Sequence, residues 1–404
     1  MEAGDTVEQV LREEGAHVLA TLIRVTGDIT LAEDAVQDAA VRALERWPRD
    51  GVPDSPRAWL IVTAKRRAID VVRREARRTG KEAEAVASFD PVPEPAGAVR
   101  DDLLRLVFTC CHPALSAEAQ VALALRTLGG LSTAEVARGL LVPEATMAKR
   151  LTRAKQKIAQ ARIPYRVPAA EELPDRLAGV AATLYLIFNE GYAAGPGEHL
   201  VRVALSDEAI RLARLLARLM PDEPTVLGLL ALLLLTDARR AARLDDRGRP
   251  VLLPDQDRAR WDTALIKEGV VLVGTALRRS PDRPDPYVVQ AAIAACHALA
   301  PSYAATDWDA IVSWYDVLLT VQEAPVIRLN RAVAVAERDG PEAGLALVEG
   351  IGGLAAYPWW HATRAELLRR TGRTAEANAA YERALALGMN DPQSEHLRRR
   401  LADL

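Results

Sequence analysis

The chain has 404 residues, enough for two or three domains, and half of them are hydrophobic. Ala and Leu recur throughout and only three residues are Phe, so we expect an all-α protein without a substantial sheet. The three cysteines, two of them adjacent, do not form a disulfide framework and fit a reducing cytoplasm. The acidic start lacks an apolar signal core, and the longest apolar run, residues 226–235, is about half a membrane span. We therefore expect a cytoplasmic protein without membrane contact.

The net charge of −3 conceals a strong segregation of charge along the chain. Residues 1–50 hold five Lys/Arg against eleven Asp/Glu, whereas residues 51–78 hold eight against three. Residues 98–168 hold eleven against five, and residues 169–404 carry a net charge of −5. Two compact basic segments inside an acidic protein predict local contact with a polyanion such as nucleic acid.

The first 78 residues predict a small helical bundle. An amphipathic stretch ends near Gly27, a capping box from Thr30 to Glu33 opens a second helix, and that helix should stop at Pro48. Residues 47–56 form a proline-rich loop, and a third helix begins around Pro56. Residues 79–97 combine acidic residues with three prolines, which is the composition of a linker.

Residues 98–168 predict a second domain of four short helices. Residues 101–111 should form a helix that ends before His112, Ser116 can cap the next helix, and Ser132 with Glu135 forms a capping box. Residues 131–158 follow the pattern of a helix-turn-helix, with a capped short helix, a turn and a basic helix that begins after a proline.

The last of these helices predicts contact with duplex DNA. Met147, Leu151 and Ala154 form its inward stripe at helical spacing. A solvated basic helix in an ordinary bundle is the alternative, but the caps, the turn and the basic helix together favour DNA binding. The side chains outside the inward stripe that could reach base edges and phosphates are Thr146, Lys149, Arg150, Arg153 and Lys157.

Residues 57–78 form a second basic helix, with eight Lys/Arg against two acidic residues. Beside a proline-rich loop and Trp59, such a helix could hold single-stranded DNA, because arginines neutralise phosphates and flat side chains stack on unstacked bases. The alternative, in which Trp59 is a core residue and the arginines face solvent, stays open for any single residue.

Beyond residue 169 the chain becomes a succession of Ala/Leu helices. Residues 342–350 align with residues 376–384 at an offset of 34, which pairs Ala343, Leu347 and Gly350 with Ala377, Tyr381 and Ala384. This rhythm of small and large residues is typical of a tetratricopeptide helix pair. Residues 175–325 show no clean period, so the prediction of repeats is weaker there.

Three segments in this order resemble bacterial sigma factors of the extracytoplasmic-function (ECF) group of the sigma-70 family: AEDAVQDAAVRALERW, PRAWLIVTAKRRAIDVVRRE and LSTAEVARGLLVPEATMAKRLTRAKQKI. The resemblance covers about residues 6–162 and implies a DNA- and polymerase-binding first domain at residues 1–78, a linker at 79–97 and a helix-turn-helix domain at 98–168. It implies core RNA polymerase, through the clamp of its largest subunit and its flap, and promoter DNA as partners.

The resemblance also implies roles for individual residues. The clamp contact falls on Asp34, Gln37 and Asp38, and residues 132–158 read the distal promoter element as duplex. The proximal element is read and melted by the loop at residues 47–56 and the helix after it, which places on that DNA the residues Trp47, Arg57, Trp59, Lys65, Arg66, Arg67, Arg73 and Arg74.

The extension, residues 169–404, resembles that of a subgroup with a C-terminal tetratricopeptide-like domain, which shares FTCCHPAL (108–115) and FNEGY (188–192). This implies regulation from within the chain, through contact of the extension with the two sigma domains, in place of a membrane-held anti-sigma protein. Stacked helix pairs also offer a concave surface to a protein or peptide partner.

Other readings of the chain predict different chemistry. Cys110, Cys111 and His112 could ligate a metal, but adjacent cysteines give poor tetrahedral geometry, so core packing is favoured. The pair Trp359-Trp360 could line a pocket, but helix packing is favoured for it. The segment at residues 189–192 could do the same, but a turn that ends a helix is favoured there. No nucleophile with its base, Walker loop or dinucleotide fingerprint occurs, so we expect neither an enzyme nor a cofactor.

Two other classes of function remain open at this point. A stand-alone activator would use the helix-turn-helix without polymerase, but it has no need of the acidic helix, loop and arginine helix at residues 30–78 and would usually dimerise. A repeat scaffold with incidental basic helices predicts no salt-dependent DNA binding.

Overall fold

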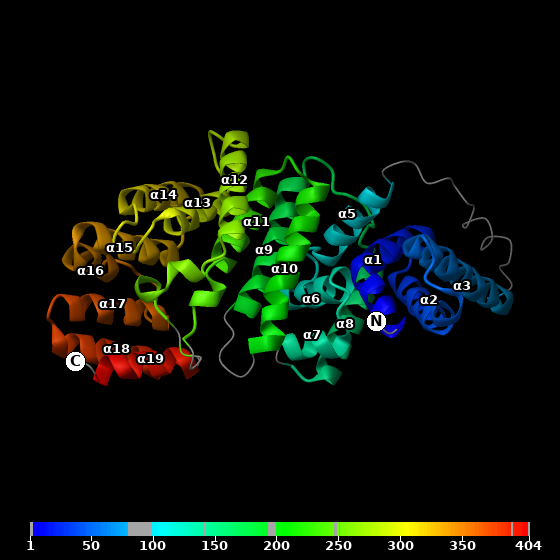
Figure 1. Ribbon diagram of the computed structural model, residues 1–404, viewed down its shortest axis with the longest axis horizontal. Helices are drawn as coiled ribbons and strands as arrows, with labels where there is room; N and C mark the ends of the chain where they lie inside the picture. Colours follow the sequence, from blue (N-terminus) through cyan, green and yellow to red (C-terminus); the bar gives the residue numbers. More distant parts are fainter. Residues whose placement is uncertain are drawn as a thin grey trace. The chain divides into compact units, whose positions relative to one another are not determined.

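The computed structural model describes residues 3–79, 98–140, 142–192, 199–245, 249, 251–388 and 391–402. Over these residues the protein is built from helices and contains no β-strand, which confirms the expected all-α fold. The chain divides into two compact units, residues 1–190 and 191–404, and each is described by itself (Figure 1). The predicted linker at residues 79–97 lies outside the described residues except for residue 79.

Three helices form the first module of the first unit: α1 (Ala3–Thr26), α2 (Ile29–Asp50) and α3 (Pro56–Thr79). Each packs against the other two. The inner face of α2 consists largely of alanines, which let the neighbouring helices approach closely, and these are Ala32, Ala35, Ala39 and Ala43.

The ends of α2 differ from the prediction. Asp28, rather than Thr30, caps the helix, because its carboxylate accepts hydrogen bonds from the backbone amides of Thr30 at 2.7 Å and Leu31 at 3.0 Å. The predicted capping box is therefore wrong, and Glu33 is free to bond elsewhere. Pro48 lies inside the last turn, and the helix ends only at Gly51, whose φ of 83° suits glycine and whose amide bonds the carbonyl of Trp47. The loop is thereby shortened to residues 51–55.

The second module of the first unit contains α5 (Ala98–Cys110), α6 (Ala117–Leu123), a π-helical segment η1 (Ala124–Leu128), α7 (Thr133–Gly139) and α8 (Glu144–Gln160). Ser116 caps α6, and Ser132 and Glu135 form the predicted reciprocal capping box at the start of α7. The predicted inward stripe of α8 is confirmed, because Met147, Leu151 and Ala154 are buried.

Helix α9 (Leu173–Tyr192) packs against the second module. Arg176 donates to the carbonyl oxygen of Phe108 at the end of α5, and its guanidinium lies 5.9 Å from the centre of the Phe108 ring. The Thr183 hydroxyl lies 3.0 Å from the side-chain oxygen of Gln120 on α6. At Gly179 an added Cβ would lie 3.7 Å from the carbonyl oxygen of Cys111. Helix α9 thus covers the end of α5 and the adjoining part of α6.

Polar contacts also join the first and second modules to each other. Arg24 on α1 donates from Nε to the Asp102 carboxylate on α5 at 2.8 Å, and Asp102 is only 1% exposed. The Tyr165 hydroxyl lies 2.9 Å from the carbonyl oxygen of Ala20 and 3.0 Å from that of Asp102. Lys155 on α8 forms an ion pair with Glu33 on α2. The two modules therefore form one body within the first unit.

The second unit is a succession of helices in which each helix packs on the next one along the chain. Between α11 and α12 lie three short 3₁₀ turns at residues 240–242, 253–255 and 258–260. The helices are α10 (His199–Leu219), α11 (Pro224–Asp237), α12 (Thr263–Arg279), α13 (Pro286–Leu299), α14 (Trp308–Val321), α15 (Pro325–Asp339), α16 (Pro341–Glu349), α17 (Pro358–Arg370), α18 (Thr374–Ala386) and α19 (Asp391–Ala402).

The apolar run at residues 226–235 lies in α11, which is buried almost all round because α10, α12 and α13 pack against it. Among the residues that the structure describes, no helix combines the length and the apolar character needed to cross a bilayer.

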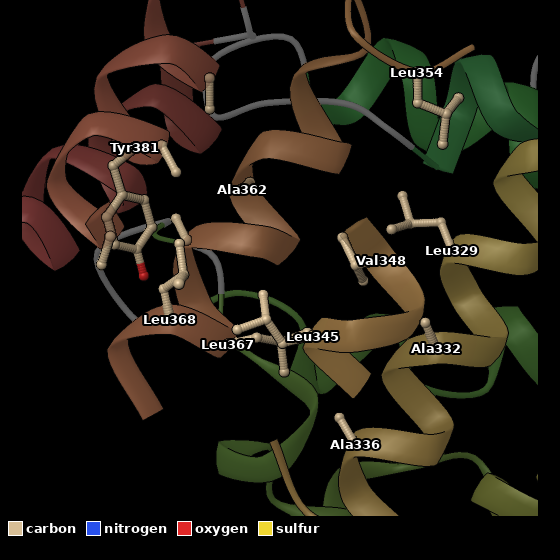
Figure 2. Packing of buried hydrophobic residues seen from close by; sticks show 14 of the residues in the cluster. Leu329, Ala332, Ala336, Leu345, Val348, Leu354, Ala362, Leu367, Leu368 and Tyr381 are labelled. Atoms are coloured by element: carbon tan, nitrogen blue, oxygen red, sulfur yellow. The ribbon is translucent and has the colours of Figure 1, made fainter. Parts of the chain in front are cut away.

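The end of the chain contains two helix pairs, α15 with α16 and α17 with α18, around one apolar core (Figure 2). The predicted register of the repeat is off by one residue. It pairs Leu347 with Tyr381, yet Leu347 is 39% exposed and Tyr381 only 1%. An offset of 33 pairs the buried Val348 with Tyr381 and the buried Gly344 with Ala377. Burial decides the register because both helices must turn the same face toward the core.

Gly344 sets how closely α15 and α16 approach. A Cβ there would lie 2.4 Å from the Cβ of Ala336 and 2.9 Å from the carbonyl oxygen of Ala332. Gly344→Ala should lower the free energy of unfolding of the second unit by about 1–3 kcal/mol, because helix backbones would have to move apart. Chemical denaturation of the full chain measures this. Gly352→Ala is the control, since nothing lies within 4 Å of its Cβ position. Equal stability of the two variants would contradict this account of the helix contact.

Candidate nucleic-acid interface

A groove of about 550 Å³ runs between the flank of α8 and the start of α6. One wall is formed by residues 114–116 with Glu118 and Ala119. The other wall contains every residue that the sequence predicted for distal-element contact: Thr146, Lys149, Arg150, Arg153 and Lys157. The structure therefore brings this predicted set together on one flank of one helix.

The electrostatics of the groove suit an anion. Within the described part of the chain, Lys149, Arg150, Arg153 and Lys157 form no ion pair. The helix that carries them is held in place by Met147, Leu151 and Ile158, which are buried on its inward face. Cations that lack carboxylate partners can neutralise phosphates without first breaking an internal ion pair.

Helix α3 carries the second basic surface. Arg66, Arg73 and Arg74 are exposed and Lys65 is half-buried, and none of the four forms an ion pair with a described residue. Trp59 is also half-buried, so part of its ring can be reached from solvent. This surface is open to a polyanion along one side of α3.

The structure does not place every predicted proximal residue on that surface. Trp47 is 4% exposed and packs edge-on against Trp59, with ring centroids 5.5 Å apart, so it supports Trp59 from the core. Arg57 lies 3.4 Å from the Glu14 carboxylate, and Arg67 is paired with Asp38. These three side chains have internal partners in this structure.

The outer face of α2 carries the residues predicted for polymerase contact. Asp34 and Gln37 are exposed, whereas Asp38 is held by Arg67 on α3. Val41 and Leu44 are 54% and 47% exposed on the same helix. These two apolar residues were not among those predicted from the sequence. Their signal was helical spacing: Gln37, Val41 and Leu44 recur at four- and three-residue intervals on the side opposite the buried alanines.

The cysteine pair packs in the core, which was the interpretation favoured over metal binding. Cys110 and Cys111 are buried, and burial raises the pKa of the Cys110 thiol and raises the pKa of the Cys111 thiol to about 12. The ring nitrogen Nδ1 of His112 accepts from the amide of Ala114. The described residues contain no group of three or more His, Cys, Asp or Glu arranged to hold a metal.

Helix packing, the interpretation favoured for Trp359 and Trp360, is supported for Trp360 but not for Trp359. Trp360 packs against the core of the last helix pairs and donates from Nε1 to the carbonyl of Val348, whereas Trp359 is exposed on α17.

Three segments of the chain match known protein families. Residues 10–78 match Sigma-70 region 2, and residues 105–158 match Sigma-70, region 4. Residues 176–277 match a family of unknown function, DUF6596. The first match covers most of α1 with α2 and α3, and the second covers most of α5 and α6 to α8.

The ECF RNA polymerase sigma factor SigL of Mycobacterium tuberculosis is 33% identical over 149 residues, which are 35% of this chain and 81% of SigL. This chain belongs to the ECF family of sigma-70 RNA polymerase sigma factors. It is thus a non-enzymatic factor of transcription initiation that acts with RNA polymerase on promoter DNA. The probable ECF RNA polymerase sigma factor SigI of the same organism is 29% identical over 177 residues, 42% of this chain and 60% of SigI.

Two further comparisons span nearly the whole chain, the extension included. The uncharacterized protein R00370 of Rhizobium meliloti (strain 1021) is 47% identical over 394 residues, which cover 96% of this sigma factor and 93% of that protein. Among solved structures, a monomeric IFIT1 mutant aligns with 96% of the chain and 95% of its own length at 12% identity, but the TM-score of 0.30 is too low to carry an argument.

Proposed function

We propose that this sigma factor binds core polymerase through the outer face of α2, reads a distal promoter element with the groove beside α8, and holds the proximal element along α3. The observation that carries the proposal is the convergence of all five predicted distal residues in one cationic groove. The second basic surface lies on α3 in the other module. A stand-alone activator would account for the groove, but it would leave the exposed outer face of α2 without a binding partner.

The docking surface on α2 is mixed in character. Asp34 supplies charge, Gln37 supplies hydrogen bonds, and Val41 and Leu44 supply apolar area. We infer that a basic and partly apolar surface on the polymerase clamp covers this stripe. Asp38 has a different role in this proposal, because its ion pair with Arg67 holds α3 against α2.

Charge reversal at Asp34 tests the polymerase contact. Asp34→Lys should weaken co-purification with core polymerase by tenfold or more, roughly the 1.4 kcal/mol or greater loss expected when an interfacial attraction becomes a repulsion. Asp70→Lys is the matched control, because Asp70 is exposed on α3 and makes the same change of charge. Unchanged recovery of polymerase with Asp34→Lys would show that α2 docks elsewhere or not at all.

Removal of one groove cation tests the distal DNA contact. Arg150→Ala should cost the holoenzyme about 1–3 kcal/mol at one base position if the side chain reads a base, or a uniform loss with a smaller salt slope if it binds phosphate. Footprinting over a salt series distinguishes the two. Arg138→Ala serves as control, since Arg138 is exposed on α7 outside the groove. Normal protection of the distal element at normal salt sensitivity would rule out docking through this groove.

We further propose that the extension controls or completes promoter activity by acting on the two sigma modules, and that its acidic repeats can also accept a peptide or protein partner. Two observations support the coupling. The extension carries a net charge of −5 against the two basic segments of the modules. Its first helix, α9, reaches the second module through Arg176 and Thr183. We favour a positive or mixed effect, because ordering two tethered domains raises their effective concentration on one promoter.

A truncation tests the coupling. A chain that ends at residue 192 keeps α9 on the second module, whereas one that ends at 168 would also uncover the end of α5 and the residue after it, Cys111. In transcription from a cognate promoter in vitro, the 192-residue chain should be several-fold less active than the full chain at equal polymerase occupancy, because the ordering effect is lost. Equal activity would refute the coupling. Higher activity of the shorter chain would retain the coupling and reverse its sign.

A further inference from the structure

The ion pair between Glu33 and Lys155 links the two functional surfaces of the first unit. Glu33 lies on α2, and Lys155 lies on α8, the helix whose other flank forms the cationic groove. The side chain of Glu33 is 10% exposed and that of Lys155 is 20% exposed. A pair so far removed from solvent is screened much less by salt than a surface pair.

Glu33 extends the stripe formed by Gln37, Val41 and Leu44, which are three of the four α2 residues proposed for polymerase contact. Glu33, Gln37, Val41 and Leu44 follow one another at intervals of four, four and three residues, which places them along one face of a helix. Three of these four are exposed, and Glu33 alone is buried. It is also the one that Lys155 of the second module contacts. The second module therefore covers the first turn of the stripe and leaves the rest open.

We propose that the Glu33–Lys155 pair is a latch that holds the two sigma modules closed and masks one end of the polymerase-docking stripe, so that Glu33 becomes a polymerase contact only after the latch opens. This inference rests on the proposed role of α2. A partner that lies along the whole stripe and Lys155 compete for the same carboxylate. Polymerase binding and module opening are then coupled, because each removes an obstacle to the other.

Other contacts also hold the two modules together. The latch therefore shifts the equilibrium between the closed and open states and is not the only contact that maintains the closed one. The Arg24–Asp102 pair and the Tyr165 hydroxyl join α1 to the second module at a different place. Breaking the latch should therefore loosen the modules without unfolding either. Lys155 forms no part of the groove lining, so its loss leaves the distal DNA surface in place.

Fluorescence energy transfer in the full chain measures opening. Dyes can be placed at Asp70→Cys on α3 and Gln160→Cys at the end of α8, both exposed, in a Cys296→Ser background. Cys110 and Cys111 are buried and need no replacement. Lys155→Glu, which sets two carboxylates against each other, should lower energy transfer and strengthen binding to core polymerase by roughly 3- to 10-fold. Lys155→Gln should give the same direction with a smaller change.

A charge swap separates closure from polymerase contact. Glu33→Lys combined with Lys155→Glu rebuilds the pair in reverse, so energy transfer should return to the wild-type value while polymerase binding falls below it. Arg138→Glu is the control, because it makes the same change of charge on the exposed side of α7 and should leave energy transfer unchanged.

The outcomes distinguish the latch from the proposed function. Unchanged energy transfer in Lys155→Glu overturns the latch. Lower energy transfer without stronger polymerase binding, while Asp34→Lys still loses polymerase, overturns the masking of Glu33 and leaves the proposed function standing. If Asp34→Lys binds polymerase normally, the proposed function of α2 fails, and the masking inference fails with it.

Discussion

The two modules of the first unit are organised around the hydrogen bonds that the Asp102 carboxylate accepts. It is almost fully buried on α5 and receives hydrogen bonds from Arg24 of α1 and Arg105 of its own helix. Burial raises the pKa of Asp102 in spite of both arginines, so the ionised carboxylate remains costly to hold there. Removal of one partner from a buried ion pair typically costs about 3–5 kcal/mol, because the other charge is left uncompensated. The first and second modules are joined at a position that tolerates little change.

This constraint explains why two DNA-handling modules form one body. Tyr165, which follows the helix-turn-helix, places its hydroxyl between a carbonyl of α1 and the carbonyl of Asp102 itself. The Glu33–Lys155 pair adds a second contact on another side of the first module. Polar contacts of this kind fix orientation more than they add stability, since their desolvation offsets much of their attraction. In the closed state, the basic surface of α3 and the groove beside α8 are thereby held in a definite mutual arrangement.

The second module contacts a helix, α9, that lies beyond the segment matching Sigma-70, region 4. The match to Sigma-70, region 4 ends at residue 158, yet α9 covers the carbonyl end of α5 and the side of α6. The adjacent Cys110 and Cys111 are buried there. The cysteine pair and the first helix of the extension are therefore parts of one packing arrangement. Helix α9 and the second module therefore share one packed surface.

Local features of the sequence determined the helices, the helix-turn-helix and the five groove residues, because caps, turns and helical spacing act over a few neighbouring residues. The sequence also determined the segregation of charge and, through the motifs of regions 2 and 4, the family. Tertiary structure decided which charges are available. Asp38, Arg57 and Arg67 look like free functional charges in the sequence, but each has a partner far along the chain. Trp47 lies in a core that only helix packing defines. Glu33, predicted to cap its own helix, bonds a lysine 122 residues away. No periodicity encodes such pairs, because they depend on how separate helices meet in space.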